Sequence, residues 1–485
     1  MKPMTGGGGV LRLQPISLSS KLCYSTGAAI DGVTSNALNL FLMFYATAVC
    51  GLPGTLAGAA LSVGLVVDAV MDPLIGSLSD GWRSRWGRRL PFMVLGTPTS
   101  AVLFVLIFSL PTGLDQTPLF FLLATLSVLL RVSISLFNLP YYALGAELTD
   151  DYGERSRIVA WRWGMGMLAG LATVLIGFGG FFGGPKGTLD RHAYSPFALI
   201  CAGLMVVGGL VSIRASSTLR HRAHAVDPDV TSGVRGLVTA IGEVARNPTF
   251  RILFLSSLLL FVGQGVTFTL SLHANTYFWR LTPAQIQNVT VALLIGLLVG
   301  APLFGVIAPR FEKKPMLIVA MCCSIATEAA PAAMRLLGVL PFQGATLGVL
   351  LSANSALLGL SITAAAISLI SMMADAADEH EHLFGHRREG LYFAGWAFAG
   401  KSAGGLGALL GGIVLDLSGF PSGATATGAH LIVSTHTAAL VALFAGPGAA
   451  VFSVAGIALL ALYNLDRARH ADILAILTIE RANVR

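Results

Sequence analysis

Long apolar blocks alternate with short polar segments along almost the whole sequence. A bilayer core takes about 20 apolar residues in a helix, and blocks of that length predict twelve transmembrane helices here. The first six are expected at Tyr24–Val49, Leu56–Leu78, Phe92–Leu110, Leu119–Leu144, Ile158–Phe182 and Pro196–Ile213. The last six are expected at Phe250–Leu272, Val289–Ile307, Met316–Leu337, Leu347–Met372, Tyr392–Leu415 and Ala438–Tyr463.

The longest polar stretch between these blocks separates them into two sets of six. Similar loops, Gly76–Pro91 and Gly305–Pro315, follow the second and eighth blocks at an offset of roughly 225–230 residues. This weak internal symmetry is typical of all-α membrane carriers whose two pseudo-symmetric halves rock against each other. We therefore expect an N-terminal six-helix half (1–213), a cytoplasmic linker (214–249), a C-terminal six-helix half (250–463) and a cytoplasmic tail (464–485).

The composition excludes an ordinary soluble protein. Of 485 residues, 54% are hydrophobic and 11% are charged, whereas a typical soluble domain has about 25% charged residues. The net charge of +7 comes from short basic runs between the apolar blocks, so we expect no nucleic acid partner. The blocks contain no catalytic constellation, so we expect neither an enzyme nor a cofactor. We expect a monomer in the lipid bilayer.

The basic residues indicate how the chain lies in the membrane. If both termini are cytoplasmic, about 24 of the 31 lysines and arginines fall on the inner side, as the positive-inside rule requires. The short loops between the blocks are typical of a bacterial inner (plasma) membrane protein. We therefore expect an integral inner membrane protein with both termini in the cytoplasm.

Several ionisable residues lie inside the apolar blocks, where each costs about 2.5–3.5 kcal/mol on insertion scales. Residues of this kind mark functional sites by default, and each needs a partner. They are Asp31, Asp68, Asp72, Arg131, Arg162, Lys401 and, nearer the end of its block, Glu328.

Asp68 and Asp72 are four residues apart, so they project from one face of a helix. Two carboxylates this close resist joint ionisation unless a cation lies between them or one takes a proton. Their hard oxygen ligands suit Na⁺ or a proton equally well, and Pro73 loosens the backbone beside them. We interpret the pair as the site of a coupling cation. The alternative is a structural pairing with Arg162 or Lys401.

Further polar and aromatic residues suggest a site for a solute. Lys401 lies too deep in its Gly- and Ala-rich block to reach water easily, and cation binding would displace it if it faced the paired aspartates. Aromatic faces and bidentate donors are what a sugar-like ligand needs, although membrane aromatics also face lipid or the interface. The expected substrate site comprises Asp31, Arg131, Asn138, Tyr142, Trp161, Arg162 and Lys401.

Charged residues also cluster at the inner ends of the second and fourth blocks. Such a cluster sets the topology, and it would also act as a gate if its ion pairs formed when the inner side is closed. The expected cytoplasmic gate comprises Asp80, Arg83, Arg88, Arg89, Glu147 and Arg155.

Four motifs of this chain resemble those of the glycoside–pentoside–hexuronide:cation symporters, a major facilitator family that includes the melibiose permease. The first is D-A-V-M-D-P-L-I-G-S-L-S-D (Asp68–Asp80), followed by R-S-R-W-G-R-R-L-P. The others are P-Y-Y-A-L-G-A-E-L-T-D-D-Y-G-E-R-S-R (Pro140–Arg157), G-H-R-R-E-G (Gly385–Gly390) and K-L-C-Y-S-T-G-A (Lys21–Ala28). They cover both halves in the family's order, and the resemblance implies the major facilitator fold.

The resemblance also implies roles for several of the candidate residues. Asp68 and Asp72 would bind the coupling cation, Na⁺ or H⁺, while Arg162 would bind sugar and Lys401 would bridge the two sites. Tyr142 falls where the melibiose branch has an aromatic residue that stacks on the sugar.

Two positions depart from that branch. Asn138 replaces a sugar-binding carboxylate, and Asp31 lies one position before the carboxylate of the first span, a rotation of about 100° on a helix. The predicted function is therefore a cation-coupled symporter of a small polar solute, a sugar or glycoside, that works by alternating access. The alternative is a carrier of the same fold for a lysophospholipid or xenobiotic, because Arg131 suits an anionic headgroup.

Overall fold

The computed structural model describes residues 16–149, 151–184, 186–219, 241–386, 388–422 and 431–483. The regular elements in these ranges are all helices, which satisfy their own backbone hydrogen bonds within a bilayer. Eleven helices of the described chain are long and apolar enough to cross a membrane. Five belong to the first half: α3 (Gly54–Gly81), α4 (Leu90–Ile107), α5 (Gln116–Glu147), α6 (Tyr152–Val174) continued by η3 (Leu175–Phe181), and α7 (Arg191–Leu219). Six belong to the second: α9 (Pro248–His273) continued by η7 (Ala274–Phe278), α10 (Pro283–Ile307), α11 (Lys313–Leu336), α12 (Gly344–Phe384), α13 (Glu389–Leu417), and α14 (Thr435–Leu443) joined through η10 (Phe444–Gly448) to α15 (Ala449–Leu460).

The remaining span is the first in the chain, and it is built from short pieces. α1 (Leu18–Ser25) and α2 (Ala28–Ala37) lead into the π-helical turns η1 (Leu38–Leu42) and η2 (Tyr45–Val49). None of these four pieces reaches membrane length alone, but together they cover the first predicted block. The prediction of an all-α membrane protein with twelve spans is therefore confirmed.

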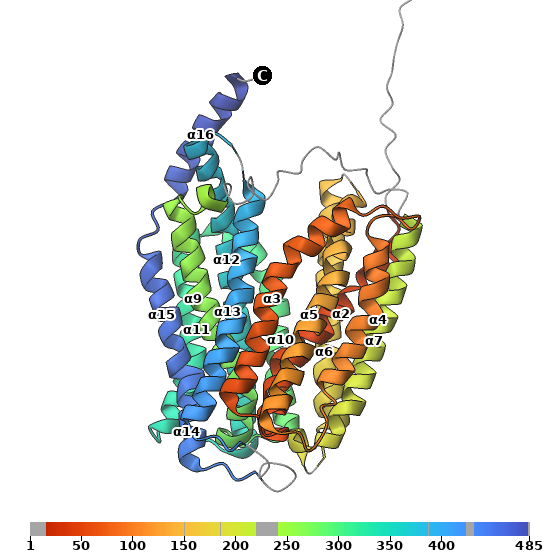
Figure 1. Cartoon of the computed structure of the whole chain (residues 1–485). Helices are drawn as coiled ribbons and strands as arrows, with labels where there is room; N and C mark the ends of the chain where they lie inside the picture. The colour runs from red at the N-terminus through yellow and green to blue at the C-terminus, as the bar shows by residue number, and fades with distance from the viewer. Residues whose placement is uncertain are drawn as a thin grey trace, which may run out of the picture.

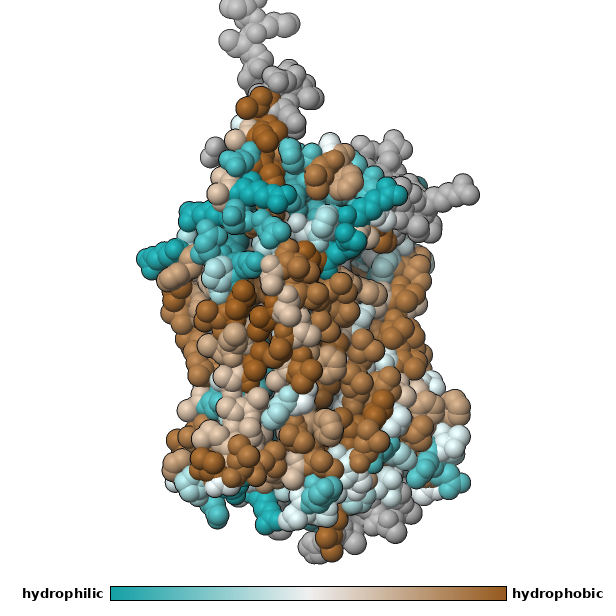
Figure 2. All heavy atoms as spheres, turned by 90° about the vertical axis from the view of Figure 1, so that its left-hand side faces the viewer, coloured by the Kyte–Doolittle hydropathy of each residue, from teal (hydrophilic) through white to brown (hydrophobic). Residues whose placement is uncertain are grey.

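The spans form two bundles that stand side by side (Figure 1). In the first bundle α2 packs on α6 and α7, and α4 packs on α5 and α7; in the second, α12 packs on α10 and α11, and α15 packs on α9. The bundles meet mainly where α13 lies against α3. Figure 2 shows a broad hydrophobic band across the middle of one face, with hydrophilic residues gathered at both ends, as a bilayer requires.

The helices extend beyond the predicted blocks at one end of the bundles. We call this end the basic end, since it carries the loops that follow α3, α5, α10 and α12, with their arginines and lysines. α12 continues to Phe384, well past the predicted limit at Met372, because hydropathy detects only the part of a helix that lies in lipid. The tail forms a further helix, α16 (Arg467–Asn483), which packs on α12 at this end (Figure 1).

The two bundles are tightly joined at the opposite end, which we call the far end. The Asp416 side chain at the end of α13 accepts hydrogen bonds from the backbone N–H groups of Gly54 (2.7 Å) and Thr55 (2.8 Å), and so caps α3 across the interface. A Cβ on Gly412 would overlap the carbonyl oxygen of Gly54, and the side chains of Thr47 and His273 are 2.8 Å apart across the same boundary. Only glycine allows helices to approach this closely.

The α3–α13 contact loosens toward the basic end. Ser62 and Leu65 of α3 still contact Gly405 of α13, and Asp68 and Asp72 lie beyond them. One turn further, a Cβ on Gly76 would have no described heavy atom within 4 Å. α3 and α13 are therefore in close contact at the far end, and α3 has no such close neighbour at Gly76 near the basic end.

We predict that Gly412→Ala destabilises the protein, while Gly305→Ala does not. The added methyl at Gly412 overlaps Gly54, and overpacking costs about 1–3 kcal/mol. At Gly305 in α10 a Cβ would meet no described atom within 4 Å, so this variant is a matched control on a helix. Thermal unfolding in detergent is expected to show a lower midpoint for Gly412→Ala alone. Equal midpoints for the two variants would contradict the close contact.

Candidate functional site

A cavity of about 630 Å³ lies between the two bundles, and residues from both line it. The first half contributes side chains from α2, α3 and α5, and the second half contributes side chains from α9 and α13. Its charged lining residues are Asp31, Asp68, Asp72, Arg131 and Lys401. Five of the seven ionisable residues singled out in the predicted spans thus converge on one space.

Lys401 connects the two halves at the centre of this cavity. Its ammonium lies 2.9 Å from a carboxylate oxygen of Asp68 and also donates to the carboxylate of Asp72. Asp68 is buried and Lys401 is partly exposed to the cavity. The lysine on α13 thus holds both carboxylates on α3, which are one helical turn apart.

Ser135 on α5 closes the other side of the carboxylate pair. Its hydroxyl oxygen lies 2.8 Å from Asp68 and 2.7 Å from Asp72. A serine hydroxyl has one proton, so it cannot give a full hydrogen bond to both carboxylates at once. One oxygen of the pair is therefore left under-coordinated, and a bound cation or an added proton would complete the cluster.

A second group of polar side chains lies next to this cluster. The Arg162 guanidinium stacks over the ring of Tyr142, 4.4 Å from its centroid, and Tyr142 lines the cavity. Asn138 donates a long hydrogen bond of 3.5 Å to Asp31, which also accepts one of 3.4 Å from Ser35. This combination offers an aromatic face, amide and carboxylate groups, and fixed positive charge, as a polar ring-shaped solute needs.

Two predicted substrate residues lie differently from the other five. Arg162 does not line the cavity but stands behind Tyr142. Trp161 is 41% exposed and is not among the residues that line the cavity, so its place in the substrate site stays a prediction. The reason is geometric: adjacent helical residues differ by about 100° in direction, so both neighbours of Arg162 turn away from the side it faces.

Four of the predicted gate residues form ion pairs within the first half. Arg89 pairs with Asp80 (2.5 Å) and Glu147 (2.9 Å), and Arg88 pairs with Glu147 (2.8 Å). These ion pairs join α3, α4 and α5 of one half. In this structure the pairs act as a brace among these three helices. The gating role that we expected of these residues stays a prediction.

The other two gate residues make no ion pair with a described residue. Arg83 is exposed in the loop after α3, and Arg155 donates to the backbone carbonyl of Thr149 at 3.4 Å.

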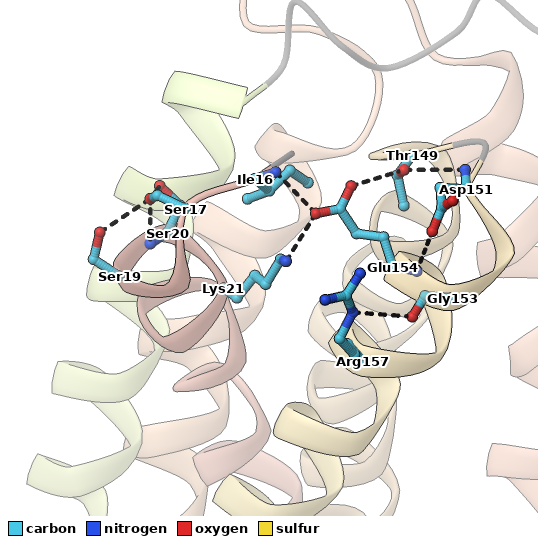
Figure 3. A network of polar contacts seen from close by, with 10 residues as sticks. All are labelled: Ile16, Ser17, Ser19, Ser20, Lys21, Thr149, Asp151, Gly153, Glu154 and Arg157. Carbon is cyan, nitrogen blue, oxygen red and sulfur yellow. Dashed lines mark hydrogen bonds and ion pairs between the residues drawn. The ribbon is translucent and has the colours of Figure 1, made fainter. Parts of the chain in front are cut away.

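A buried network near the basic end was not predicted as a site (Figure 3). The Lys21 ammonium lies 2.8 Å from Glu154, and the side chains of both are less than 10% exposed. Glu154 also accepts hydrogen bonds from the backbone of Ile16 (2.8 Å) and the hydroxyl of Thr149 (3.1 Å). The network fastens α1 to the start of α6. Both charged residues belong to motifs recognised in the sequence, but their pairing depends on the fold.

Glu243, His380 and His386 also lie close together, with ligand atoms within 4.8 Å of one another. However, Arg388 lies 3.0 Å from the Glu243 carboxylate, where its fixed charge opposes a metal cation. The hydrogen bond from His386, assisted by Arg388, lowers the pKa of the Glu243 carboxyl. We assign this cluster to fastening the segment before α9 onto the second half.

We predict that Lys401→Met destabilises the protein, and that Asp72→Asn partly restores stability in that background. Removing the ammonium leaves two carboxylates facing each other, at a cost of about 1–3 kcal/mol, and neutralising one of them relieves the repulsion. Thermal unfolding of the wild type, both single variants and the double variant measures the coupling. Strictly additive effects would show that the three side chains do not interact.

The family model described as MFS/sugar transport protein matches residues 23–467. An uncharacterized symporter of Synechocystis is 26% identical over 96% of this chain and 97% of its own length. The isoprimeverose transporter of Lactiplantibacillus pentosus is 24% identical, over 86% of this chain and 84% of that protein. The sodium-dependent lysophosphatidylcholine symporter 1 of Gallus gallus is also 24% identical, over 84% of this chain and 80% of that protein. The nucleoside transporter NupG has the same fold, with a TM-score of 0.62 at 17% identity over 91% of this chain and 99% of that structure. The chain therefore belongs to the MFS/sugar transport family of secondary transporters, and its motifs identify it as a glycoside–pentoside–hexuronide:cation symporter type of major facilitator protein.

Proposed function

We propose that this protein carries a sugar or glycoside across the membrane together with one cation, Na⁺ or H⁺, by alternating access. The observation that carries the proposal is the salt bridge of Lys401 to Asp68 and Asp72 across the boundary between the two halves. A cation that binds the same carboxylates competes with the lysine. Cation binding and the contact between the halves are then linked.

The charges of the cluster favour the binding of a single cation. Two carboxylates and one ammonium leave one negative charge, which one Na⁺ or one proton would neutralise. Two carboxylates with a serine hydroxyl offer hard oxygen ligands for Na⁺, and the same carboxylates also accept a proton. The site therefore suits either Na⁺ or H⁺ as the coupling ion.

A sugar or glycoside suits the rest of the lining. Tyr142 offers an aromatic face held by Arg162, and Asp31 and Asn138 offer oxygen and amide groups at the edge of the same space. Relatives named as an isoprimeverose transporter and as a glucuronide carrier homolog support this solute class.

A lysophospholipid is the second candidate, and Arg131 is the observation in its favour. Arg131 lines the cavity and makes no ion pair with a described residue, so it is available to an anionic headgroup. The relative from Gallus gallus is named as a lysophosphatidylcholine symporter. A carrier of this kind would transport labelled lysolipid and no sugar.

We further propose that the basic end faces the cytoplasm of a bacterial cell, as the positive-inside rule favours. Both termini then lie in the cytoplasm, and the structure corresponds to an inward-facing state that is closed at the far end. The protein would act as a monomer in the inner membrane, with the cavity of one chain holding both solute and cation.

Uptake into proteoliposomes tests this function. We expect a labelled glycoside from a panel to accumulate when a Na⁺ gradient or a pH gradient is imposed. The gradient-driven uptake rate of the Asp72→Asn variant should be at least about tenfold lower than that of the wild type, because losing one charged ligand costs more than about 1.4 kcal/mol. Asp115→Asn is the matched control, since Asp115 lies in the exposed loop before α5.

The two parts of the proposal fail in different ways. Gradient-driven uptake that survives in Asp72→Asn would contradict the cation site. Absence of uptake for every sugar, with transport of labelled lysolipid, would contradict the solute class and favour the second candidate.

A further inference from the structure

A second cavity of about 300 Å³ adjoins the central one. Ser35, Asn39 and Phe268 line both cavities, so the two spaces share a wall at the boundary between the halves. The second cavity extends away from Lys401 into the second bundle, among α9, α10, α11 and α12. None of the roles proposed above uses it.

Glu328 on α11 faces this second cavity. Its carboxyl makes no hydrogen bond or ion pair with any residue in the described ranges, whereas the buried carboxylate Asp68 is held by a lysine and a serine. An unpaired carboxyl at membrane depth is costly, so such a residue is a candidate ligand-binding group. The partner that it needs is missing from the part of the chain that the structure describes.

Other polar side chains of this lining fall into two groups. Most hydroxyls are already bonded to helix carbonyls: Thr267 to Ala445, Ser271 to Phe268, Thr290 to Ile286 and Thr327 to Cys323. By contrast, the side-chain amides of Asn39 and Asn275 make no hydrogen bond to a described residue. The carboxyl of Glu328 and these two amides therefore remain available to a bound molecule.

Three π-helical turns of the backbone also lie at this cavity. Asn39 lies in the π-helical turn η1 and Asn275 in the π-helical turn η7, and residues of η10, a third such turn, line the same cavity. Each π-turn weakens a helix locally, and such turns occur frequently at functional sites. Three of them converge on one small space here.

The composition of the lining indicates the kind of ligand. The walls are mostly apolar and include Leu293, Leu294, Leu297 and the Trp279 ring, and they carry a few separate hydrogen-bonding groups. A sugar ring has apolar faces and a hydroxylated edge, and pockets of this composition suit it. A carboxylate and two amides can accept from and donate to those hydroxyls.

We propose that the second cavity is a subsite for the second sugar unit of a disaccharide or glycoside, with Glu328, Asn39 and Asn275 bonding its hydroxyls. This inference rests on the proposed function: the first unit occupies the central cavity beside Tyr142, and the second occupies the adjoining cavity, with the linkage at the wall that Ser35, Asn39 and Phe268 share. The carrier therefore prefers two-unit solutes to the corresponding monosaccharides.

The test compares uptake of matched sugars by wild type, Glu328→Leu and Asn275→Ala in proteoliposomes. The labelled pairs are galactose with melibiose, xylose with isoprimeverose, and glucose with cellobiose. For the pair that the wild type takes up, we expect Glu328→Leu to raise the KM of the disaccharide by about ten- to one-hundredfold, the range for losing a buried hydrogen-bond partner. Asn275→Ala should raise it by about three- to tenfold. The monosaccharide KM should change by less than about twofold in both variants.

The monosaccharide serves as the folding control, because a variant that still transports it is intact. Glu312→Gln, which changes an exposed carboxylate before α11, should leave both KM values unchanged. Equal effects on both sugars, or no effect on either, would overturn the subsite. A changed pH or Na⁺ dependence with unchanged sugar preference would also overturn it and would make Glu328 an ion-binding group. If the wild type took up no sugar, the proposed function itself would fail.

Discussion

The salt bridge from Lys401 to Asp68 and Asp72 is the interaction on which the central site depends. It places one positive charge of the second half between two negative charges of the first, with a single serine hydroxyl shared between the carboxylates. In an apolar span none of these charges is stable alone. Removing the lysine therefore requires another cation in its place, and this exchange would link ion binding to the contact between the halves.

The packing on either side of this salt bridge determines how the halves can move. Toward the far end, glycines of α3 and α13 bring the two backbones into contact, and Asp416 caps α3 from the other half. Toward the basic end the ion pairs of Arg88 and Arg89 stay within one half. Each half is thus braced internally, and the boundary between them can open without breaking a brace.

Much of this arrangement could be predicted from the sequence, because charge and apolar length carry strong signals in a membrane. The twelve spans followed from hydropathy, and Asp68, Asp72 and Lys401 stood out since buried charges are costly. Neutral groups gave no such signal: Ser135 was missed although it touches both carboxylates. A local pattern does not fix helix rotation, so it could not show that Trp161 lies outside the cavity lining, and the π-turns of the first span depend on packing.

Selective acylation of the Lys401 amine, followed by mass spectrometry, measures directly whether Asp68 and Asp72 hold this lysine. We expect Lys401 to react slowly while both carboxylates hold its ammonium. Its reaction should be at least about tenfold faster in Asp72→Asn, and also faster in wild type with saturating Na⁺ if Na⁺ is the coupling ion, because each change weakens that hold. Lys314, bonded to backbone carbonyls at the basic end, serves as the internal reference. A Lys401 rate that is the same in wild type and in Asp72→Asn would contradict the shared site.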